Sequence, residues 1–244
     1  MSPVTAEPRT IVQTAKQLRE KIGQVRSRAG NEQILQMWKP IQDTLPRHRE
    51  RMETLLTATR NLRRQNVISE TQLLVPRDFE ESVLAKLEKF RVRLTTKPSK
   101  VMEGNTWANC NTALAGAAID LEATLKRIWS NYIQLLLPNV ENLRPFVNLG
   151  RCAADMQKIT RLEGELNALK ESLPTNESKF VEAEHKSREI KGLVAKLELG
   201  DIPAAVKKFV EKVNSLQGAT LVDLDDHVFS WLREKSLLGA FRIK

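Results

Sequence analysis

The sequence predicts an all-α protein of long antiparallel helices, about seven or eight in number, with one coiled-coil hairpin among them. Aromatic residues make up only 5% of the 244 residues, and glycine and proline occur ten times each. This composition favours helices over sheets and leaves long segments without interruption. Apolar residues also recur at alternating steps of three and four, which is the spacing of a helical seam.

Two helices are expected in the first 64 residues. The first occupies about residues 8–29, and its apolar side chains follow the seam spacing: Ile11, Ala15, Leu18, Ile22 and Val25. The second occupies about residues 31–64, with Asn31 as its N-cap. Pro40 and Pro46 fall inside it. Because each proline removes a backbone donor, we expect this helix to be kinked or divided.

A third and a fourth helix follow, separated by an exposed loop at Lys97–Lys100 where Pro, Ser and Lys gather. The third starts near Pro76, and its inner face comprises Phe79, Val83, Leu87, Phe90 and Leu94. The fourth is the longest, from Asn105 or Thr106 to Pro138. Its expected stripe is Trp107, Cys110, Leu114, Ala117, Leu121, Leu125, Ile128, Tyr132 and Leu135.

The most specific architectural signal is a pair of matching seams around a short turn at Pro174–Asn176. The fifth helix has Pro145 near its start and a seam of Leu149, Ala153, Met156, Ile159, Leu162, Leu166, Leu169 and Leu173. The sixth has Phe180, Ala183, Ser187, Ile190, Val194 and Leu197. Two seams of equal period joined by a short turn predict an antiparallel hairpin that packs as a coiled coil.

The last 44 residues are expected to form two short helices. Residues 200–203 break the hairpin arm, and Gly218 can cap the seventh helix. Thr220 and Asp223 have capping-box spacing for a last helix. Phe241 and Ile243 alternate with charged residues, which favours a short terminal strand.

The charge of the chain divides it unevenly. Residues 1–100 carry 20 Lys and Arg against 11 Asp and Glu, whereas residues 101–244 carry 19 of each, so the whole net charge of +9 lies in the first part. Three regions are therefore expected: a basic helical region at 1–100, the long helix and hairpin at 101–200, and a small apolar helical segment at 201–244. The basic region points to an anionic partner.

Composition also bears on where the chain works. The first eight residues lack a basic start and an apolar stretch, so we expect no signal peptide. The longest near-apolar run, residues 113–119, is far shorter than the roughly 20 residues that span a bilayer. Cys110 and Cys152 have no neighbouring ligands at metal-binding spacing and are expected as buried free thiols. A soluble, cytoplasmic protein without membrane contact is expected.

No pattern in the sequence indicates catalysis. The glycines are single, so no loop is suited to phosphates, and no cofactor is expected. His48, His185 and His227 are far apart, and Asp223 with His227 supplies only two ligands, so no metal site is expected. Both cysteines lie on apolar helix faces without an activating base. The chain is expected not to be an enzyme, and no motif assigns it to a known family.

Basic residues in the first hundred positions are the first functional lead, because phosphate backbones attract such surfaces. The candidates for nucleic-acid contact are Arg47, Arg49, Arg51, Arg60, Arg63, Arg64, Lys86, Lys89, Arg93, Lys97 and Lys100. The alternative is a set of solvated helix faces, partly paired with neighbouring glutamates. Few aromatic residues accompany them, which argues against stacking on single-stranded bases.

The apolar C-terminal segment is the second lead. The candidates for docking to a partner are Leu224, Val228, Trp231, Leu232, Leu237, Leu238, Phe241 and Ile243. The alternative is that this segment folds back and closes the protein's own core.

These leads give two hypotheses. The first is a non-enzymatic structural or adaptor subunit of a cytoplasmic multiprotein complex, acting as a scaffold through coiled-coil and C-terminal contacts with protein partners. The second is a DNA-associated accessory subunit of a coiled-coil ATPase or nuclease machine, with the basic region on the phosphate backbone. The seams could also pair between two copies, so homo-oligomerisation is a further alternative.

Overall fold

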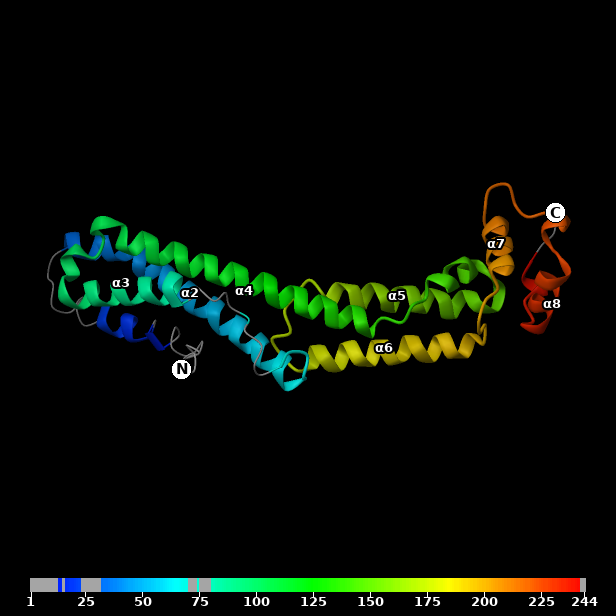
Figure 1. Ribbon diagram of the computed structural model, residues 1–244, viewed down its shortest axis with the longest axis horizontal. Helices are drawn as coiled ribbons and strands as arrows, with labels where there is room; N and C mark the ends of the chain where they lie inside the picture. The colour runs from blue at the N-terminus through cyan, green and yellow to red at the C-terminus, as the bar shows by residue number, and fades with distance from the viewer. Residues whose placement is uncertain (1–12, 15, 23–31, 70–73, 75–79, 242–244) are drawn as a thin grey trace. The chain divides into compact units, whose positions relative to one another are not determined.

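The computed structural model describes residues 13–14, 16–22, 32–69, 74 and 80–241. Throughout these residues the regular secondary structure is helical, with α-helices α2 to α8 and several shorter helical turns, and no strand occurs among them (Figure 1). The prediction of an all-α fold is confirmed. The seam of the first expected helix is described only in part, and in that part Leu18 and Ile22 are buried.

Backbone proximity groups the chain into two compact units. Unit 1 comprises residues 1–129 and 173–177, and unit 2 comprises residues 130–172 and 178–244. The boundary between residues 129 and 130 falls inside a continuous helix. The three-part division at residues 100 and 200 stays a prediction.

Unit 1 contains α2 (Glu32–Arg64), α3 (Ala85–Thr96) and most of α4 (Thr106–Leu136). A π-helical segment, Glu80–Leu84, leads directly into α3. The expected start of this helix near Pro76 lies outside the described residues. Two single 3₁₀ turns, Pro98–Lys100 and Glu103–Asn105, connect α3 to α4, where the sequence predicts a loop.

The two prolines of α2 do not divide it. Pro40 and Pro46 both lie inside one continuous helix of 33 residues, so the expectation of a divided helix was wrong. Both prolines are exposed. The carbonyl groups that lose a helical partner therefore face water, which can hydrate them at little cost.

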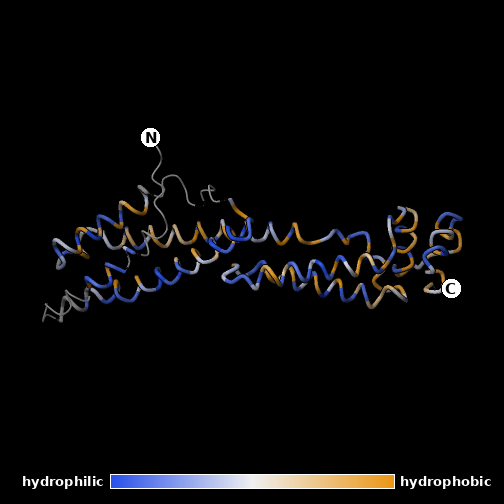
Figure 2. The backbone as a smooth tube through the Cα atoms, turned by 90° about the horizontal axis from the view of Figure 1, so that it is seen from below, coloured by the Kyte–Doolittle hydropathy of each residue, from blue (hydrophilic) through white to orange (hydrophobic). Residues whose placement is uncertain are grey.

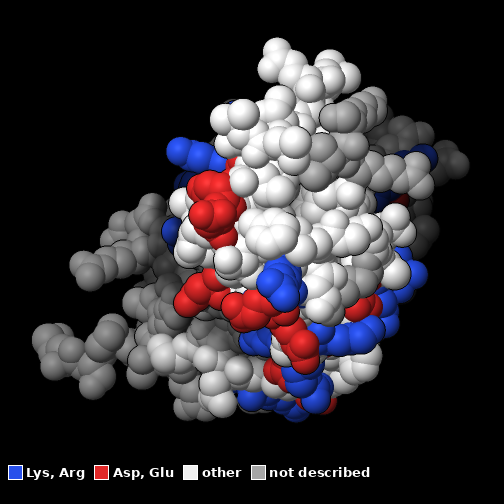
Figure 3. All heavy atoms as spheres, turned by 90° about the vertical axis from the view of Figure 1, so that its right-hand side faces the viewer, with Lys and Arg blue, Asp and Glu red and all other residues white. Residues whose placement is uncertain are grey.

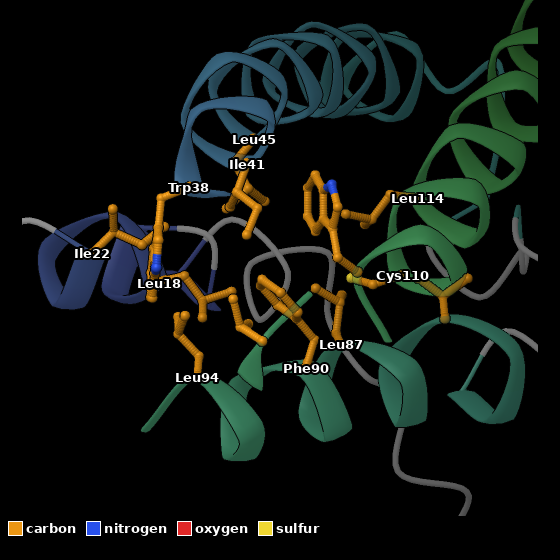
Figure 4. Packing of buried hydrophobic residues seen from close by; sticks show 13 residues of the cluster. Leu18, Ile22, Trp38, Ile41, Leu45, Leu87, Phe90, Leu94, Cys110 and Leu114 are labelled. Carbon is orange, nitrogen blue, oxygen red and sulfur yellow. The ribbon is translucent and has the colours of Figure 1, made fainter. Parts of the chain in front are cut away.

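The core of unit 1 brings together side chains from α2, α3, α4 and the helical residues 16–22. Phe90 of α3 is fully buried, and its ring centroid lies 5.1 Å from that of Trp107 at the start of α4. Leu18, Ile41 and Cys110 point into the same cluster (Figure 4). At roughly 1.5–3 kcal/mol for each buried large apolar side chain, this cluster accounts for a large share of the stability of the unit.

The buried face of α4 differs from the predicted stripe. Trp107, Cys110, Leu114, Leu121 and Leu125 of the stripe are buried, although Ala118 is buried where the stripe has Ala117. Further along, Trp129 and Ile133 are buried, whereas Leu135 is 84% exposed. The buried residues of α4 recur on average about every 3.7 residues, close to the natural period of an α-helix. A strict heptad seam has a period of 3.5 and drifts away from the buried face over a helix this long.

Unit 2 contains the expected helical hairpin. Its arms are α5 (Ala153–Leu169) and α6 (Ser178–Leu197). The buried side chains come from the predicted seams: Met156, Ile159, Leu162 and Leu166 in α5, and Phe180, Ala183, Ser187, Ile190 and Leu197 in α6. Figure 2 shows hydrophobic and hydrophilic residues alternating along both arms, as expected for helices with one buried face.

Ion pairs between the arms fix their direction. Lys158 lies 2.5 Å from Glu189, and Lys196 lies 3.0 Å from Asp155, while Lys186 pairs with Glu165 nearer the turn. As the residue number of the α5 member of a pair falls, the residue number of its α6 partner rises, so the two arms run antiparallel. Whether they interlock as a coiled coil stays a prediction.

The hairpin also packs against the last turns of α4. The ring of Tyr132 lies 5.8 Å from that of Phe180 between centroids. Ser187, a polar residue on the predicted seam, is buried because its hydroxyl donates to the carbonyl of Leu136 at 2.6 Å. This bond satisfies a carbonyl at the end of α4 that has no helical partner.

The start of α5 was placed too early in the sequence. Residues Glu141–Asn148, which include Pro145, form a 3₁₀ helix, and Leu149 is extended with φ −89° and ψ 111°. A second 3₁₀ turn, Gly150–Cys152, precedes the α-helix. The 3₁₀ helix buries Leu143 and Phe146 despite its different period.

The C-terminal part of unit 2 contains α7 (Ala204–Val213) and α8 (Asp226–Glu234). The predicted capping box forms, but it caps the 3₁₀ turn Leu221–Asp223 and not α8, which is capped by Asp225. Gly218 has a positive φ of 73° but lies beyond the end of α7, whose C-cap is Asn214. A further 3₁₀ turn, Leu238–Ala240, follows α8, and most of the predicted terminal strand lies outside the described residues.

Candidate functional site

The basic residues of α2 do not form a single surface. At 100° per residue, Arg47 and Arg51 lie on one flank of the helix, while Arg49, Arg60 and Arg64 lie on another. Arg63 is exposed between the latter flank and the buried side. The sequence cluster therefore separates into small groups.

Several of these arginines are held by acidic partners. Arg49 lies 2.7 Å from Glu53, Arg64 lies 3.1 Å from Glu177, and Arg51 of α2 lies 2.8 Å from Glu122 of α4. The hydrogen bond from Arg51 and the neighbouring Lys126 hold the pKa of the Glu122 carboxyl below its usual range. These pairs reduce the positive charge that α2 offers to an anion.

The candidate contact residues of α3 and its C-cap Lys97 share one face. Lys86, Lys89, Arg93 and Lys97 are spaced by three, four and four residues along the helix. The three lysines are exposed, and none of them lies within 4 Å of a described carboxylate. Arg93 is half-buried and donates to the hydroxyl of Thr106 at 2.7 Å. We call these four residues the α3 basic stripe.

The one described acidic residue of α3, Glu88, lies across the buried face from the α3 basic stripe. It pairs with Arg91 at 2.5 Å, and the hydrogen bond from Arg91 lowers the pKa of its carboxyl. The positive charge of the stripe is therefore not offset by its own helix. Lys100, the last of the sequence candidates, is exposed in the 3₁₀ turn that follows.

Four of the eight predicted docking residues lie in the core of unit 2. Val228, Leu232 and Leu237 are almost fully buried, and Trp231 is 9% exposed. The rings of Phe146 and Trp231 are 6.1 Å apart between centroids. Leu224, Leu238 and Phe241 are half-buried, with the ring of Phe241 lying 5.5 Å from that of Phe209, and Ile243 lies outside the described residues. Docking through these residues stays a prediction, but in this structure most of them pack against their own chain.

A different set of apolar side chains is exposed in the same part of the chain. Among the described residues, eight large apolar side chains are exposed, and four of them fall between positions 216 and 229. These four are Leu216 at 108%, Val222 at 92%, Leu221 at 66% and Phe229 at 41% of full exposure. We call residues 214–232 the exposed segment. None of these four is among the predicted docking residues, because apolar density alone does not tell which side chains face outward.

The exposed segment is acidic. It contains Asp223, Asp225 and Asp226 but no Lys, Arg or Glu. Lys212 of α7 and the hydroxyl and backbone of Thr220 bond to Asp223, which lowers the pKa of its carboxyl to about 2. Asp225 accepts a bond from the backbone nitrogen of Val228 at 2.7 Å, while Asp226 is exposed in the first turn of α8.

The candidate nucleophiles and metal ligands of the chain are not brought together. Cys110 is buried, and desolvation raises the pKa of its thiol to about 12, which leaves it protonated at neutral pH. The Nε2 atom of His48 lies 2.6 Å from the side-chain oxygen Oδ1 of Asn111, within hydrogen-bond distance. No group of three His, Cys, Asp or Glu side chains with the geometry of a metal site occurs in the described part of the chain. That the chain is not an enzyme stays a prediction.

Two further observations concern the chain as a whole. None of the helices in the described residues is both long and apolar enough to cross a bilayer. No protein-family model, curated protein or solved structure matches the sequence.

Proposed function

We propose that this chain is a non-enzymatic adaptor subunit of a cytoplasmic multiprotein complex, and that it binds a protein partner through the exposed segment. The observation that carries the proposal is the concentration of Leu216, Leu221, Val222 and Phe229 within 14 residues. Single exposed apolar residues are common on monomeric proteins, but concentrated ones mark interaction sites.

The environment of the exposed segment supports a role in binding. Val228 and Leu232, on the face of α8 next to Phe229, are buried and anchor the helix on unit 2. The capping box holds the turn that carries Leu221 and Val222. The exposed side chains are therefore presented by an ordered backbone, which lowers the entropic cost of binding.

The hairpin fits the scaffolding part of the proposal. Its two arms bury apolar seams and are joined by ion pairs along their length. At 1.5 Å per residue, an arm of 20 residues extends about 30 Å. Coiled-coil packing of the arms would make this a stiff spacer between binding surfaces.

The test is retention of partners on the full-length tagged protein expressed in its native host. We expect the double variant Leu221→Ser, Val222→Ser to lose at least about 90% of a specific partner, because both side chains are exposed and the substitutions remove only apolar contact surface. The measurement is quantitative mass spectrometry of the purified assembly.

The matched control is Val181→Ser, which removes a similarly exposed apolar side chain from α6. This variant should retain the partner. The proposal fails if the double variant retains the same proteins as the unaltered chain, or if the control loses them equally. Circular dichroism should give the same helicity and melting temperature for all three proteins.

The α3 basic stripe favours a second candidate function, contact with duplex nucleic acid in an accessory role to a DNA machine. From Lys86 to Lys97 the helix rises about 16 Å, a length over which duplex DNA presents about ten phosphates. The lysines have no described acidic partner, unlike Arg49, Arg51 and Arg64 of α2.

The second candidate predicts duplex binding that weakens steeply with salt. Replacing Lys86, Lys89 and Lys97 by Gln should reduce the slope of log affinity against log salt by about 2.7, since each phosphate contact contributes about 0.9. The measurement is a fluorescence anisotropy titration with a labelled duplex at several salt concentrations. As a control, replacing Arg188, Lys191 and Lys208 of unit 2 by Gln removes the same charge and should leave the slope unchanged. This candidate is rejected if the control variant reduces the slope equally, or if the affinity for duplex does not depend on salt concentration.

A further inference from the structure

We propose that the partner element bound by the exposed segment is an amphipathic helix whose apolar face is flanked by Lys and Arg. This inference rests on the proposed adaptor function and adds the chemistry of the partner. Three properties of the segment support it: its charge, the state of its backbone and the side chains that it leaves exposed.

The charge of the segment is opposite to that of the chain. The protein carries a net charge of +9, yet residues 214–232 contain three aspartates and no basic residue besides His227. Asp225 and Asp226 are exposed about one turn before Phe229, and the exposed Arg233, just outside the segment, lies one turn after it. The charge of Asp223 is offset by Lys212. Figure 3, which faces α7 and α8, shows acidic side chains, with some basic ones among them, next to a broad uncharged surface. Acidic groups around apolar ones favour a basic amphipathic partner.

The backbone of the segment offers no edge for a strand. The amides of Asp223 and Leu224 bond to the carbonyls of Thr220 and Leu221 at 3.0 and 3.2 Å, and the amide of Val228 bonds to Asp225. No strand occurs in the described part of the chain to which a partner strand could add. Recognition must therefore use side chains, and a helix presents apolar anchors at suitable spacing.

The same charge argues against a lipid surface. Exposed Leu216, Leu221 and Val222 could enter a bilayer, but cytoplasmic leaflets carry anionic lipids that attract basic residues and repel aspartates. A basic amphipathic peptide can bury the apolar side chains of the segment and also pair with its aspartates. An anionic membrane can bury the apolar side chains but repels the aspartates.

The experiment uses the full-length protein and a labelled synthetic peptide of about 18 residues, or five helical turns, with Leu on one face and Lys on the other. A second peptide replaces every Lys by Glu, and a third has the Lys and Leu in scrambled order. We expect the basic amphipathic peptide to bind at least about tenfold more tightly than either control peptide, with binding weakened by salt. Fluorescence anisotropy measures all three affinities.

Two variants connect the binding to the segment. Leu221→Ser with Val222→Ser should weaken binding of the basic peptide by about tenfold or more, and Asp226→Lys should weaken it by about fivefold through charge reversal. Val181→Ser and Asp201→Lys make the same changes at exposed positions outside the segment and should have no effect. Neither test substitution touches Asp225, which caps α8.

The outcomes separate this inference from the proposed function. If the basic and acidic peptides bind equally, or if Asp226→Lys has no effect, the charge argument is overturned. The same holds if light scattering finds a dimer that the double variant abolishes and the peptide does not disrupt. In each of these cases the double variant can still lose its partner in the partner-retention experiment, and the adaptor proposal then stands. If the double variant retains the partner as well, the adaptor proposal itself is rejected.

Discussion

Replacing Leu237 by Ala is expected to lower the free energy of unfolding by about 2–5 kcal/mol, because the side chain has no exposed surface and its removal leaves a cavity. The backbone around it is ordered: the amide of Leu237 bonds to the carbonyl of Leu232 at 2.8 Å, and that of Ala240 bonds to Leu237 at 3.0 Å. The surrounding backbone therefore cannot easily collapse into the cavity that the substitution creates.

The measurement is urea unfolding followed by circular dichroism. Val222→Ala supplies the matched control, because it also shortens an aliphatic side chain of the C-terminal part but at a position that is 92% exposed. The control should change stability by no more than about 0.5 kcal/mol. A stable Leu237→Ala protein that has lost its partner would instead support docking through Leu237 and would contradict its role in the core.

Replacing Phe90 by Ala is expected to destabilise unit 1 by about 3–5 kcal/mol, the usual cost of removing a large buried aromatic side chain. Phe90 is fully buried in the cluster that joins α2, α3 and α4, and its ring contacts Trp107. Loss of the pair also removes an aromatic contact worth about 0.5–1.5 kcal/mol beyond the buried area.

Val92→Ala is the control for Phe90, since Val92 lies in the same helix and is 46% exposed. The readout is the denaturant midpoint, followed by tryptophan fluorescence, to which Trp38 and Trp107 of the cluster contribute. An unchanged midpoint for Phe90→Ala would mean that α3 is not packed as described. In that case the common face assigned to Lys86, Lys89 and Lys97 would also lose its basis.

The hairpin was predictable because its sequence repeats one physical requirement. Each arm must bury one face against the other, and the apolar steps of three and four record that requirement directly. Ser187 illustrates its limit: the position was correct, but the carbonyl of Leu136 that makes a buried serine favourable comes from a helix about fifty residues away. The apolar spacing within one helix does not indicate a hydrogen-bond partner that comes from another helix.

Other features depend on geometry that a local pattern does not record. Leu149 and Pro145 fit a helical seam by spacing, yet the backbone there is 3₁₀ and then extended. Trp231 and Phe229 are both aromatic and lie two residues apart, but only the former faces the core. Leu221 and Val222 lie in a single 3₁₀ turn that is too short for any period to indicate a buried side. The exposed segment therefore became visible only in the structure.

The most direct test of the adaptor account is hydrogen exchange of the full-length chain, measured alone and within the assembly purified from its host. The account predicts that amide exchange in residues 214–232 slows at least about tenfold in the assembly, with smaller changes along α5 and α6. Unchanged exchange across residues 214–232, with new protection confined to other helices, would contradict it.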